Sequence, residues 1–243
     1  MRRYSRQKRK KGKRMRRYIL NGTLNTRDLG GYPTGSGEYT KYGKLLRSDG
    51  PYELSAADLD MLYSMGITTA IDLRSAGEVS RKPSSFSSDS RFVHHHRHIN
   101  DKLRELNGEA DIPDGYFNMM DQNDNVRDVM RIIAGAPGGV LFHCAAGKDR
   151  TGCTAALLLD LAGVALVDII ADYQVTETYI LEMWQRIISE FPELPEFYGR
   201  SRPEYIEGFM ARVYEEYGGA RGFLLALGVT EAELDSIMQK LLG

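Results

Sequence analysis

The sequence is short of three features that would each indicate a particular class of protein. It has only two cysteines in 243 residues, Cys144 and Cys153, which is too few for a disulfide framework and typical of a reducing compartment. No stretch approaches the roughly 18 apolar residues that a membrane-spanning helix needs, and the N-terminus lacks the apolar segment of a secretory signal. We therefore expect a cytoplasmic protein, or one exported without a conventional signal peptide, whose chemistry uses a free thiol.

A net charge of -1 hides an uneven distribution of charge along the chain. Residues 1–17 hold eleven Lys or Arg and no acid, which leaves 21 basic against 33 acidic residues in the remainder. The acidic body gives no reason to expect nucleic-acid binding by the folded domain. The basic segment has one aromatic residue and no amphipathic pattern, so we expect a disordered tail. Contact of this tail with RNA or an anionic membrane surface is one alternative, and a true start at Met15 is another.

The remainder, residues 18–243, has the length of a single domain with a substantial core. Patterns typical of strands alternate with helical ones, which predicts an α/β sandwich with a largely parallel sheet flanked by helices. We expect strands at residues 45–46, 67–73, 91–99 and 139–143 and helices over 55–65, 115–134 (with a break near 121–125) and 151–163. The last eighty residues are expected to be helical, and Thr230 with Glu233 predicts a capping box for the final helix.

One segment combines several residues with reactive or anion-binding groups. Residues 143–152 read His-Cys-Ala-Ala-Gly-Lys-Asp-Arg-Thr-Gly and lie between a predicted buried strand and an alanine-rich helix. A loop that enters a helix N-terminus points backbone N–H groups inward, and with the helix dipole these groups form a site for a phosphate dianion. Gly147 allows the tight turn. The same positive potential lowers the pKa of a thiol, so Cys144 is expected to be a thiolate nucleophile.

Three further side chains of the segment suit phosphoryl transfer. The planar guanidinium of Arg150 can hold two phosphate oxygens and stabilise the charge of the transition state, which a lysine could not reproduce. The Thr151 hydroxyl can hydrogen-bond the sulfur as it leaves the phosphocysteine, and His143 is expected to orient the loop. This chemistry requires no metal and no other cofactor.

The segment resembles the signature of protein tyrosine phosphatases, which is His-Cys, five residues, Arg, then Thr or Ser. Two more stretches, Asn25-Thr-Arg-Asp-Leu-Gly-Gly31 and Asp72-Leu-Arg-Ser with Glu78, are similar to the bacterial tyrosine/serine phosphatase family. The resemblance covers about residues 20–243. It implies the phosphatase α/β fold and substrates that include phosphotyrosine, sometimes phosphoserine or phosphothreonine, and in several members phosphoinositides.

The family pattern also assigns roles to residues of this sequence. It makes Cys144 the nucleophile and Arg150 the phosphate clamp, with a backbone cradle formed by Ala145, Ala146, Gly147, Lys148 and Asp149. Lys148 adds positive charge at the mouth of the loop, which favours a multiply phosphorylated ligand over a lone phosphotyrosine. Arg27 and Asp28 of the N-terminal motif either brace the loop or form only a structural salt bridge.

The general acid is left open by the sequence. Conventional tyrosine phosphatases carry it on a Trp-Pro-Asp loop, but this chain has no such tripeptide, and its single Trp184 follows the signature. The family resemblance favours Asp149. The alternatives are Asp111, Asp114 and Asp121, because proton donation depends on a hydrogen-bond reach that the sequence does not give.

Three other predictions concern the surroundings of the loop. His94, His95, His96 and His98 could suggest zinc, but alternation along a strand divides them between two faces, and no Cys or acid completes a set at ligand spacing. We therefore predict no metal site. Cys153 is expected to pack in the core, with a reversible disulfide to Cys144 as the alternative. The aromatic-rich helices from Tyr179 to Tyr217 are expected to pack on the core. The alternative, implied by the resemblance, is a helical lid over residues 190–218.

Together these patterns predict a protein tyrosine phosphatase, dual-specificity included, that works through a phosphocysteine intermediate. The closest alternative keeps this mechanism and acts on phosphoinositides. A phosphate-binding adaptor without turnover is the rival of another class, although the intact set of Cys144, Arg150 and Thr151 argues against it.

Overall fold

The computed structural model describes residues 15–100, 106 and 108–243, and within them a sheet has the strand order β1-β2-β5-β3-β4. The strands are β1 (Arg27–Asp28), β2 (Leu45–Ser48), β3 (Ile67–Asp72), β4 (Val93–His96) and β5 (Gly139–His143). β1 runs antiparallel to β2, and every other neighbouring pair is parallel. The predicted α/β class with a largely parallel sheet is confirmed.

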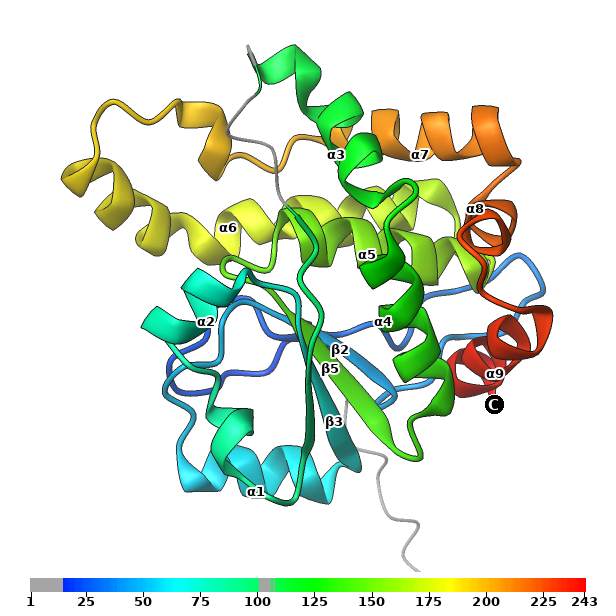
Figure 1. Cartoon of the computed structure of the whole chain (residues 1–243), viewed down its shortest axis with the longest axis horizontal. Helices are drawn as coiled ribbons and strands as arrows, with labels where there is room; N and C mark the ends of the chain where they lie inside the picture. The colour runs from blue at the N-terminus through cyan, green and yellow to red at the C-terminus, as the bar shows by residue number, and fades with distance from the viewer. Residues whose placement is uncertain (1–14, 101–105, 107) are drawn as a thin grey trace, which may run out of the picture.

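The central strand β5 shows how the sheet separates two cores. Val140 and Phe142 belong to a large apolar cluster on one face, whereas Leu141 belongs to a smaller cluster on the other, as the two-residue period of a strand requires. The smaller cluster is covered by α1 (Ala56–Ser64) and η1 (Ser85–Ser88), with α2 (Ala76–Arg81) nearby. Figure 1 shows these short elements below and to the left of the sheet.

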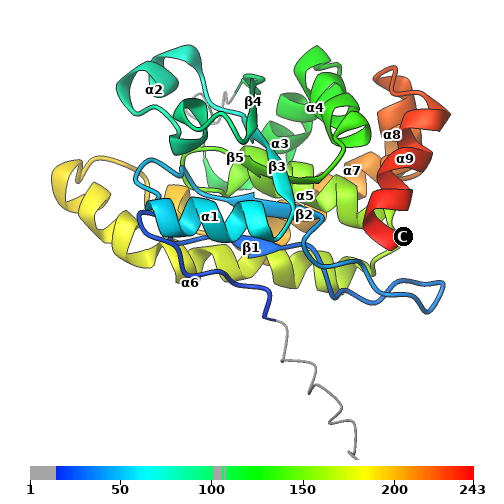
Figure 2. The same ribbon diagram turned by 90° about the horizontal axis from the view of Figure 1, so that it is seen from below.

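The larger cluster is covered by the remaining helices, which Figure 1 shows above and to the right of the sheet. They are η3 (Glu109–Asp111), α3 (Ile112–Met120), α4 (Asp124–Gly135), α5 (Asp149–Leu161), α6 (Leu166–Glu190), η4 (Glu196–Gly199), α7 (Pro203–Tyr217), α8 (Ala220–Ala226) and α9 (Glu231–Leu242). Figure 2 shows the long helix α6 running along one side of the molecule. The predicted helical C-terminal region is thus confirmed.

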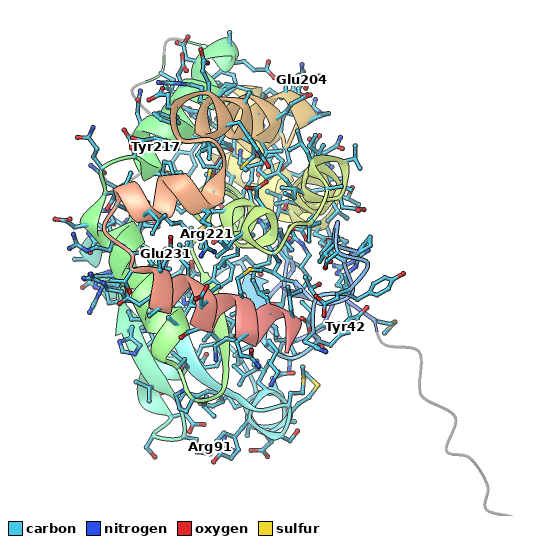
Figure 3. All side chains as sticks on the ribbon, turned by 90° about the vertical axis from the view of Figure 1, so that its right-hand side faces the viewer. Tyr42, Arg91, Glu204, Tyr217, Arg221 and Glu231 are labelled. Carbon is cyan, nitrogen blue, oxygen red and sulfur yellow. The ribbon has the colours of Figure 1, made fainter. Side chains whose placement is uncertain are left out.

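Capping explains several helix boundaries. The predicted capping box of Thr230 and Glu233 is present at the start of α9, where Arg221 of α8 also pairs with Glu231 (Figure 3). The helix expected over 115–134 is two helices, because α3 ends at Met120, with Asp121 as its C-cap, and the Asn123 side chain caps α4. The strand expected over 91–99 is shorter, since only Val93–His96 pairs with β3.

The segment expected to be either core or a lid divides into two parts. Helix α7 packs against α3 and α5, and its apolar side chains are buried, namely Tyr205, Ile206, Phe209, Met210 and Val213. The expected core packing is therefore confirmed for α7, and the alternative of a lid does not fit this helix, because moving it would expose the core. The part before it, with η4, is more exposed and contacts the loop described below.

The described part of the N-terminal segment begins at residue 15. The side chains of Arg16 and Arg17 stack on Tyr32 and Tyr179, at 4.0 and 3.8 Å from the ring centroids. Residues 1–14, the main part of the predicted tail, lie outside the described residues. Among the described helices, none has the length and apolarity to cross a membrane.

Candidate active site

The candidate site is the loop between β5 and α5. Cys144 directly follows the last residue of β5, and α5 begins at Asp149, two residues before the predicted helix start. The Cys144 side chain is almost completely buried. The cysteine therefore lies at the carboxyl end of a central parallel strand and in front of a helix N-terminus, as the sequence pattern predicted.

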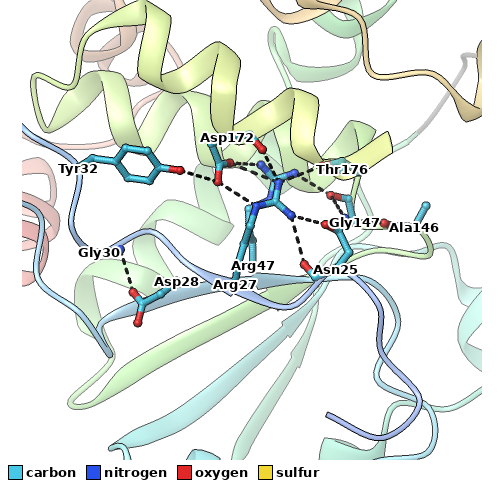
Figure 4. Close-up of polar contacts among 10 residues, drawn as sticks. All are labelled: Asn25, Arg27, Asp28, Gly30, Tyr32, Arg47, Ala146, Gly147, Asp172 and Thr176. Atoms are coloured by element: carbon cyan, nitrogen blue, oxygen red, sulfur yellow. Dashed lines mark hydrogen bonds and ion pairs between the residues drawn. The ribbon is translucent and has the colours of Figure 1, made fainter. Parts of the chain in front are cut away.

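Three carbonyl groups of the loop are held from outside. The Gly50 N–H donates to Ala145 O at 3.0 Å, the Asn25 side-chain amide to Ala146 O at 3.0 Å, and the Arg47 guanidinium to Gly147 O at 2.7 Å. In a trans peptide the N–H points opposite to the C=O of the same unit. Figure 4 shows the contacts of the Ala146 and Gly147 carbonyl groups. The N–H groups of residues 146, 147 and 148 are thereby turned the other way, as an anion cradle requires.

Gly147 is required at its position for two reasons. Its φ is +68°, a conformation that residues with a side chain rarely adopt. A Cβ atom there would also lie 2.7 Å from backbone atoms of Ser48 and Asp49. The loop can therefore approach the end of β2 only because this residue has no side chain.

A buried ionic network supports the side of the loop on which its carbonyl groups accept hydrogen bonds (Figure 4). Asp172 of α6 accepts from Arg27 Nε at 2.9 Å and from Arg47 Nη1 at 2.5 Å, and Tyr32 also donates to it. Arg27 in turn donates to the Asn25 side chain. Burial opposes the charged form of Asp172, but the two guanidinium groups outweigh it and hold the pKa of Asp172 well below its usual range. Arg27 thus reaches the loop through Asn25.

The contacts of Asp28 lie elsewhere. Its carboxylate accepts from the Gly30 and Gly43 N–H groups, both at 2.8 Å, and from the Tyr18 hydroxyl. These contacts fold the N-terminal segment onto itself and do not involve the loop. Arg27 and Asp28, which the sequence suggested as a pair, therefore serve two different parts of the structure.

Arg150 lies in the first turn of α5 and is gripped by a carboxylate. Its Nη1 and Nη2 donate to the two oxygens of Glu78 at 2.9 and 3.1 Å. Glu78 belongs to the capping box of α2, so the start of this helix fixes the plane of the guanidinium. Burial raises the pKa of Glu78, but the hydrogen bonds and charge of Arg150 outweigh burial and lower it to about 2.

Asp149 receives a hydrogen bond from a buried tyrosine. The Tyr116 hydroxyl lies 2.5 Å from Asp149 Oδ1 and 2.6 Å from the Tyr173 hydroxyl. Burial, followed by the charge of Asp149, raises the pKa of both tyrosines well above the usual value, so both hydroxyls keep their protons. The Asp149 side chain itself is 20% exposed, which leaves it accessible from the surface.

The alternative acids are bound to other groups. Asp114 pairs with Arg212 of α7 at 2.9 Å, and Asp121 accepts from the Tyr217 hydroxyl at 2.7 Å. Asp111 is the last residue of η3. The contacts of Asp114 and Asp121 thus fasten α3 to α7, whereas Asp149 belongs to the loop itself.

Lys148 points toward η4 rather than out of the loop. Its ammonium donates to the carbonyl oxygens of Tyr198 and Arg200, at 3.0 Å for Arg200, and it lies 3.4 Å from the Asp149 carboxylate. The side chain is 4% exposed. The positive charge expected at the mouth of the loop is therefore engaged by the segment that passes over it.

The remaining predicted residues lie in the interior. His143 is fully buried, its Nδ1 lies 3.3 Å from Cys144 O, and burial lowers its pKa to about 4. The Thr151 hydroxyl is buried and has no hydrogen-bond partner among the described residues. Cys153 is buried as a free thiol on α5, and burial raises its pKa well above the usual value.

Sequence reasoning missed the residues that hold the loop from other elements. Arg47, Asp172, Tyr116 and Tyr173 were given no role at the site. One signal was available for Asp172. It shares the buried stripe of α6 with Ile169, Thr176 and Ile180, and an acid on such a stripe is expected to be paired.

Comparison with known proteins agrees with this geometry. A family model described as tyrosine phosphatase family matches residues 18–243. The chain is 32% identical over 207 residues to a tyrosine-protein phosphatase of Nostoc commune, covering 77% of this chain and 70% of the relative. It is 27% identical over 277 residues to the triple specificity protein phosphatase PtpB of Mycobacterium tuberculosis, covering 92% and 98%.

Among solved structures, the chain is similar to that of P. aeruginosa TpbA in complex with pTyr. The identity is 17%, the match covers 79% of this chain and 91% of the other, and the TM-score is 0.43.

Proposed function

The chain belongs to the tyrosine phosphatase family and is a protein tyrosine phosphatase, and from this premise we propose that Cys144 is its nucleophile. In the first step the Cys144 sulfur attacks phosphorus and the bond to the ester oxygen breaks. The leaving oxygen takes a proton from the Asp149 carboxyl group. The product is a phosphocysteine and a free tyrosine hydroxyl.

In the second step water attacks the phosphocysteine. The Asp149 carboxylate takes the proton of this water, the S–P bond breaks, and the Thr151 hydroxyl stabilises the sulfur that leaves. Phosphate is released and the thiolate is restored. Throughout both steps Arg150 holds the equatorial oxygens, with its plane set by Glu78.

The observation that carries this proposal is the outward capture of three successive loop carbonyls by Gly50, Asn25 and Arg47. It leaves the amide N–H groups next to Cys144 for an anion, where they stabilise both a thiolate and the transition-state charge. An adaptor would bind phosphate through the same amides. The set of a cysteine, an acid and a hydroxyl at the same loop supports turnover instead.

The proposal is tested with an aryl phosphate and the two cysteines of the chain. Cys144→Ser should lower kcat by roughly 10⁴- to 10⁶-fold, as the loss of a covalent nucleophile does elsewhere. Cys153→Ala is the matched control and should keep kcat within a few fold, because Cys153 lies in the core. Equal rates for wild type and Cys144→Ser would overturn the assignment.

The substrate range is a separate part of the proposal. We infer that phosphotyrosine is the main substrate and that phosphoserine and phosphothreonine esters are hydrolysed more slowly, since one relative is named a triple specificity phosphatase. Phosphoinositides are the second candidate, and their recognition by Lys148 would require its ammonium to leave the Tyr198 and Arg200 carbonyls. Phosphate release from the three phosphopeptides and from phosphoinositide vesicles, for wild type and Lys148→Met, ranks them. A loss confined to the vesicles would favour the lipid.

A further inference from the structure

Three neighbouring strands bring a carboxylate and two imidazoles together beneath the phosphate loop. In the parallel register Asp72 of β3 lies opposite His143 of β5, and Ala70 lies opposite His94 of β4. Ala70 and Asp72 are two residues apart and share one face of the sheet, so His94 and His143 share this face as well. One ligand atom from each of Asp72, His94 and His143 lies within 4.8 Å of the others.

Both imidazoles have a nitrogen without a partner. Within the described part of the chain, Nε2 of His94 and Nε2 of His143 are buried and form no hydrogen bond. His143 has no exposed surface, and its Nε2 lies 3.8 Å from Asp72 Oδ2, beyond hydrogen-bond distance. A buried polar atom without a partner is costly, so these two atoms indicate that something polar is missing between them.

The other nitrogen of His143 decides what can fill the space. The Cys144 carbonyl only accepts, so Nδ1 must carry the proton in the contact with Cys144 O. In a neutral ring Nε2 then presents a lone pair toward the Asp72 carboxylate, and two electron-rich atoms repel each other unless a cation lies between them. An imidazole that donates one N–H to a carbonyl and presents its other nitrogen is also the usual state of a metal ligand.

We propose that Asp72, His94 and His143 bind one divalent transition-metal ion, zinc being the best match to two imidazoles and a carboxylate. Zinc keeps such donors at about 2.0–2.2 Å, which needs side-chain movements on the order of 1 Å here and leaves a fourth position for water. Arg74 donates to both Asp72 oxygens, at 2.9 and 2.5 Å, and so becomes the outer partner that orients this ligand.

This site differs from a zinc site built from the histidine run alone, which the sequence could suggest. Alternation does divide the histidine run, and His95 lies on the opposite face from His94. The acid and the second histidine that the run lacks are supplied by β3 and β5. Because His143 precedes Cys144, the ion would lie directly behind the residue that positions the proposed nucleophile.

The test uses the full chain with Cys144→Ser, so that the thiol cannot bind the ion. Zn²⁺ is titrated against a chelating indicator in phosphate-free buffer, and Co²⁺ absorption reports the geometry of the site. We expect one equivalent to bind at micromolar concentration with the Co²⁺ bands of four-coordination. Adding His94→Ala should weaken binding at least roughly 10-fold, whereas adding His95→Ala, its neighbour on the exposed strand β4, should not change it.

Two results would overturn the site. If Cys144→Ser alone abolishes Zn²⁺ binding, the ion sits on the thiol. If His94→Ala and His95→Ala bind equally well, the proposed ligands are wrong, and circular dichroism of both variants shows whether the fold is kept. Neither result bears on phosphatase activity, which is measured separately with wild-type Cys144.

Discussion

The two sides of the phosphate loop are held in different ways. On the carbonyl side, Arg27, Arg47 and Asp172 are each at most 3% exposed, and their hydrogen bonds reach from the N-terminal segment across β2 to α6. On the side of Lys148 and Arg150, the partners are Glu78 in the first turn of α2 and carbonyl groups of the segment around η4, both near the surface. The first side is a closed interior network, and the second is a set of separate pairs.

This difference follows from what each side has to do. Amide groups stabilise an anion best when they are fixed before it arrives. The buried network fixes them, because two guanidinium groups bind the single carboxylate of Asp172. A residue that transfers a proton or meets a substrate must stay accessible, so its contacts are fewer and more exposed. We therefore expect changes on the carbonyl side to affect folding, and changes on the other side to affect catalysis.

The largest effect is expected from Asp172→Ala, because it leaves Arg27 and Arg47 buried without a carboxylate. The free energy of unfolding should fall by about 3–5 kcal/mol, measured by urea denaturation. Glu182→Gln, on the exposed part of the same helix, is the control and should change it by less than about 0.5 kcal/mol. If Asp172→Ala were as stable as the control, the network would not support the loop.

This network also marks the limit of what the sequence could predict. The strand, the loop and the following helix come from local patterns, and the residues from Cys144 to Thr151 occur within one stretch of the chain. Asp172 lies 125 residues from Arg47 along the chain, and nothing local to either residue indicates the other. Only the folded sheet brings them together.

The same reason explains what the sequence did not indicate around the loop. Lys148 was expected at the mouth because its charge suits phosphate, but the carbonyls that bind it belong to a segment fifty residues later. The histidine run was judged by spacing in one strand, whereas the acid and the imidazole that lie near His94, namely Asp72 and His143, belong to two other strands. Core packing and a lid could not be told apart for α7, because an apolar helix face fits both equally well.

A second prediction concerns the side that we expect to affect catalysis. Asp149→Asn should lower kcat for an alkyl-type substrate such as a phosphoserine peptide by roughly 10²-fold, since its poor leaving group needs a proton. The loss should be much smaller for an aryl phosphate with a good leaving group. Asp114→Asn, whose partner is on α7, should change neither rate. An equal loss on both substrates would point to a structural role for Asp149.

A third prediction uses the acid side of the pH range. The pKa of Glu78 is about 2 in the folded chain against 4.5 unfolded. Its contribution to the free energy of unfolding is therefore present above pH 4.5 and is lost as the pH falls from 4.5 toward 2. Glu78→Gln should therefore be less stable than wild type by about 1 kcal/mol at pH 7, with the difference shrinking below pH 4.5. In an Arg150→Met background the difference should be small at every pH, and an unchanged difference would mean that Arg150 is not the partner that matters.

The smallest effect is expected from removing the Lys148 contacts, and a similar lysine contact elsewhere in the chain is the control. Lys148 donates to the carbonyls of Tyr198 and Arg200, and Lys240 donates in the same way to Ala136 and Gly138, far along the chain from the loop. Lys148→Met should raise KM for a phosphotyrosine peptide about 2- to 5-fold and speed hydrogen exchange in η4, because it removes the hydrogen bonds that hold this segment over the loop. Lys240→Met should speed exchange only around residues 136–138 and leave KM unchanged. If both variants changed KM alike, the effect on KM would come from a loss of overall stability and not from the Lys148 contacts. The side of the loop near Lys148 would then not differ from the carbonyl side in its effect on catalysis.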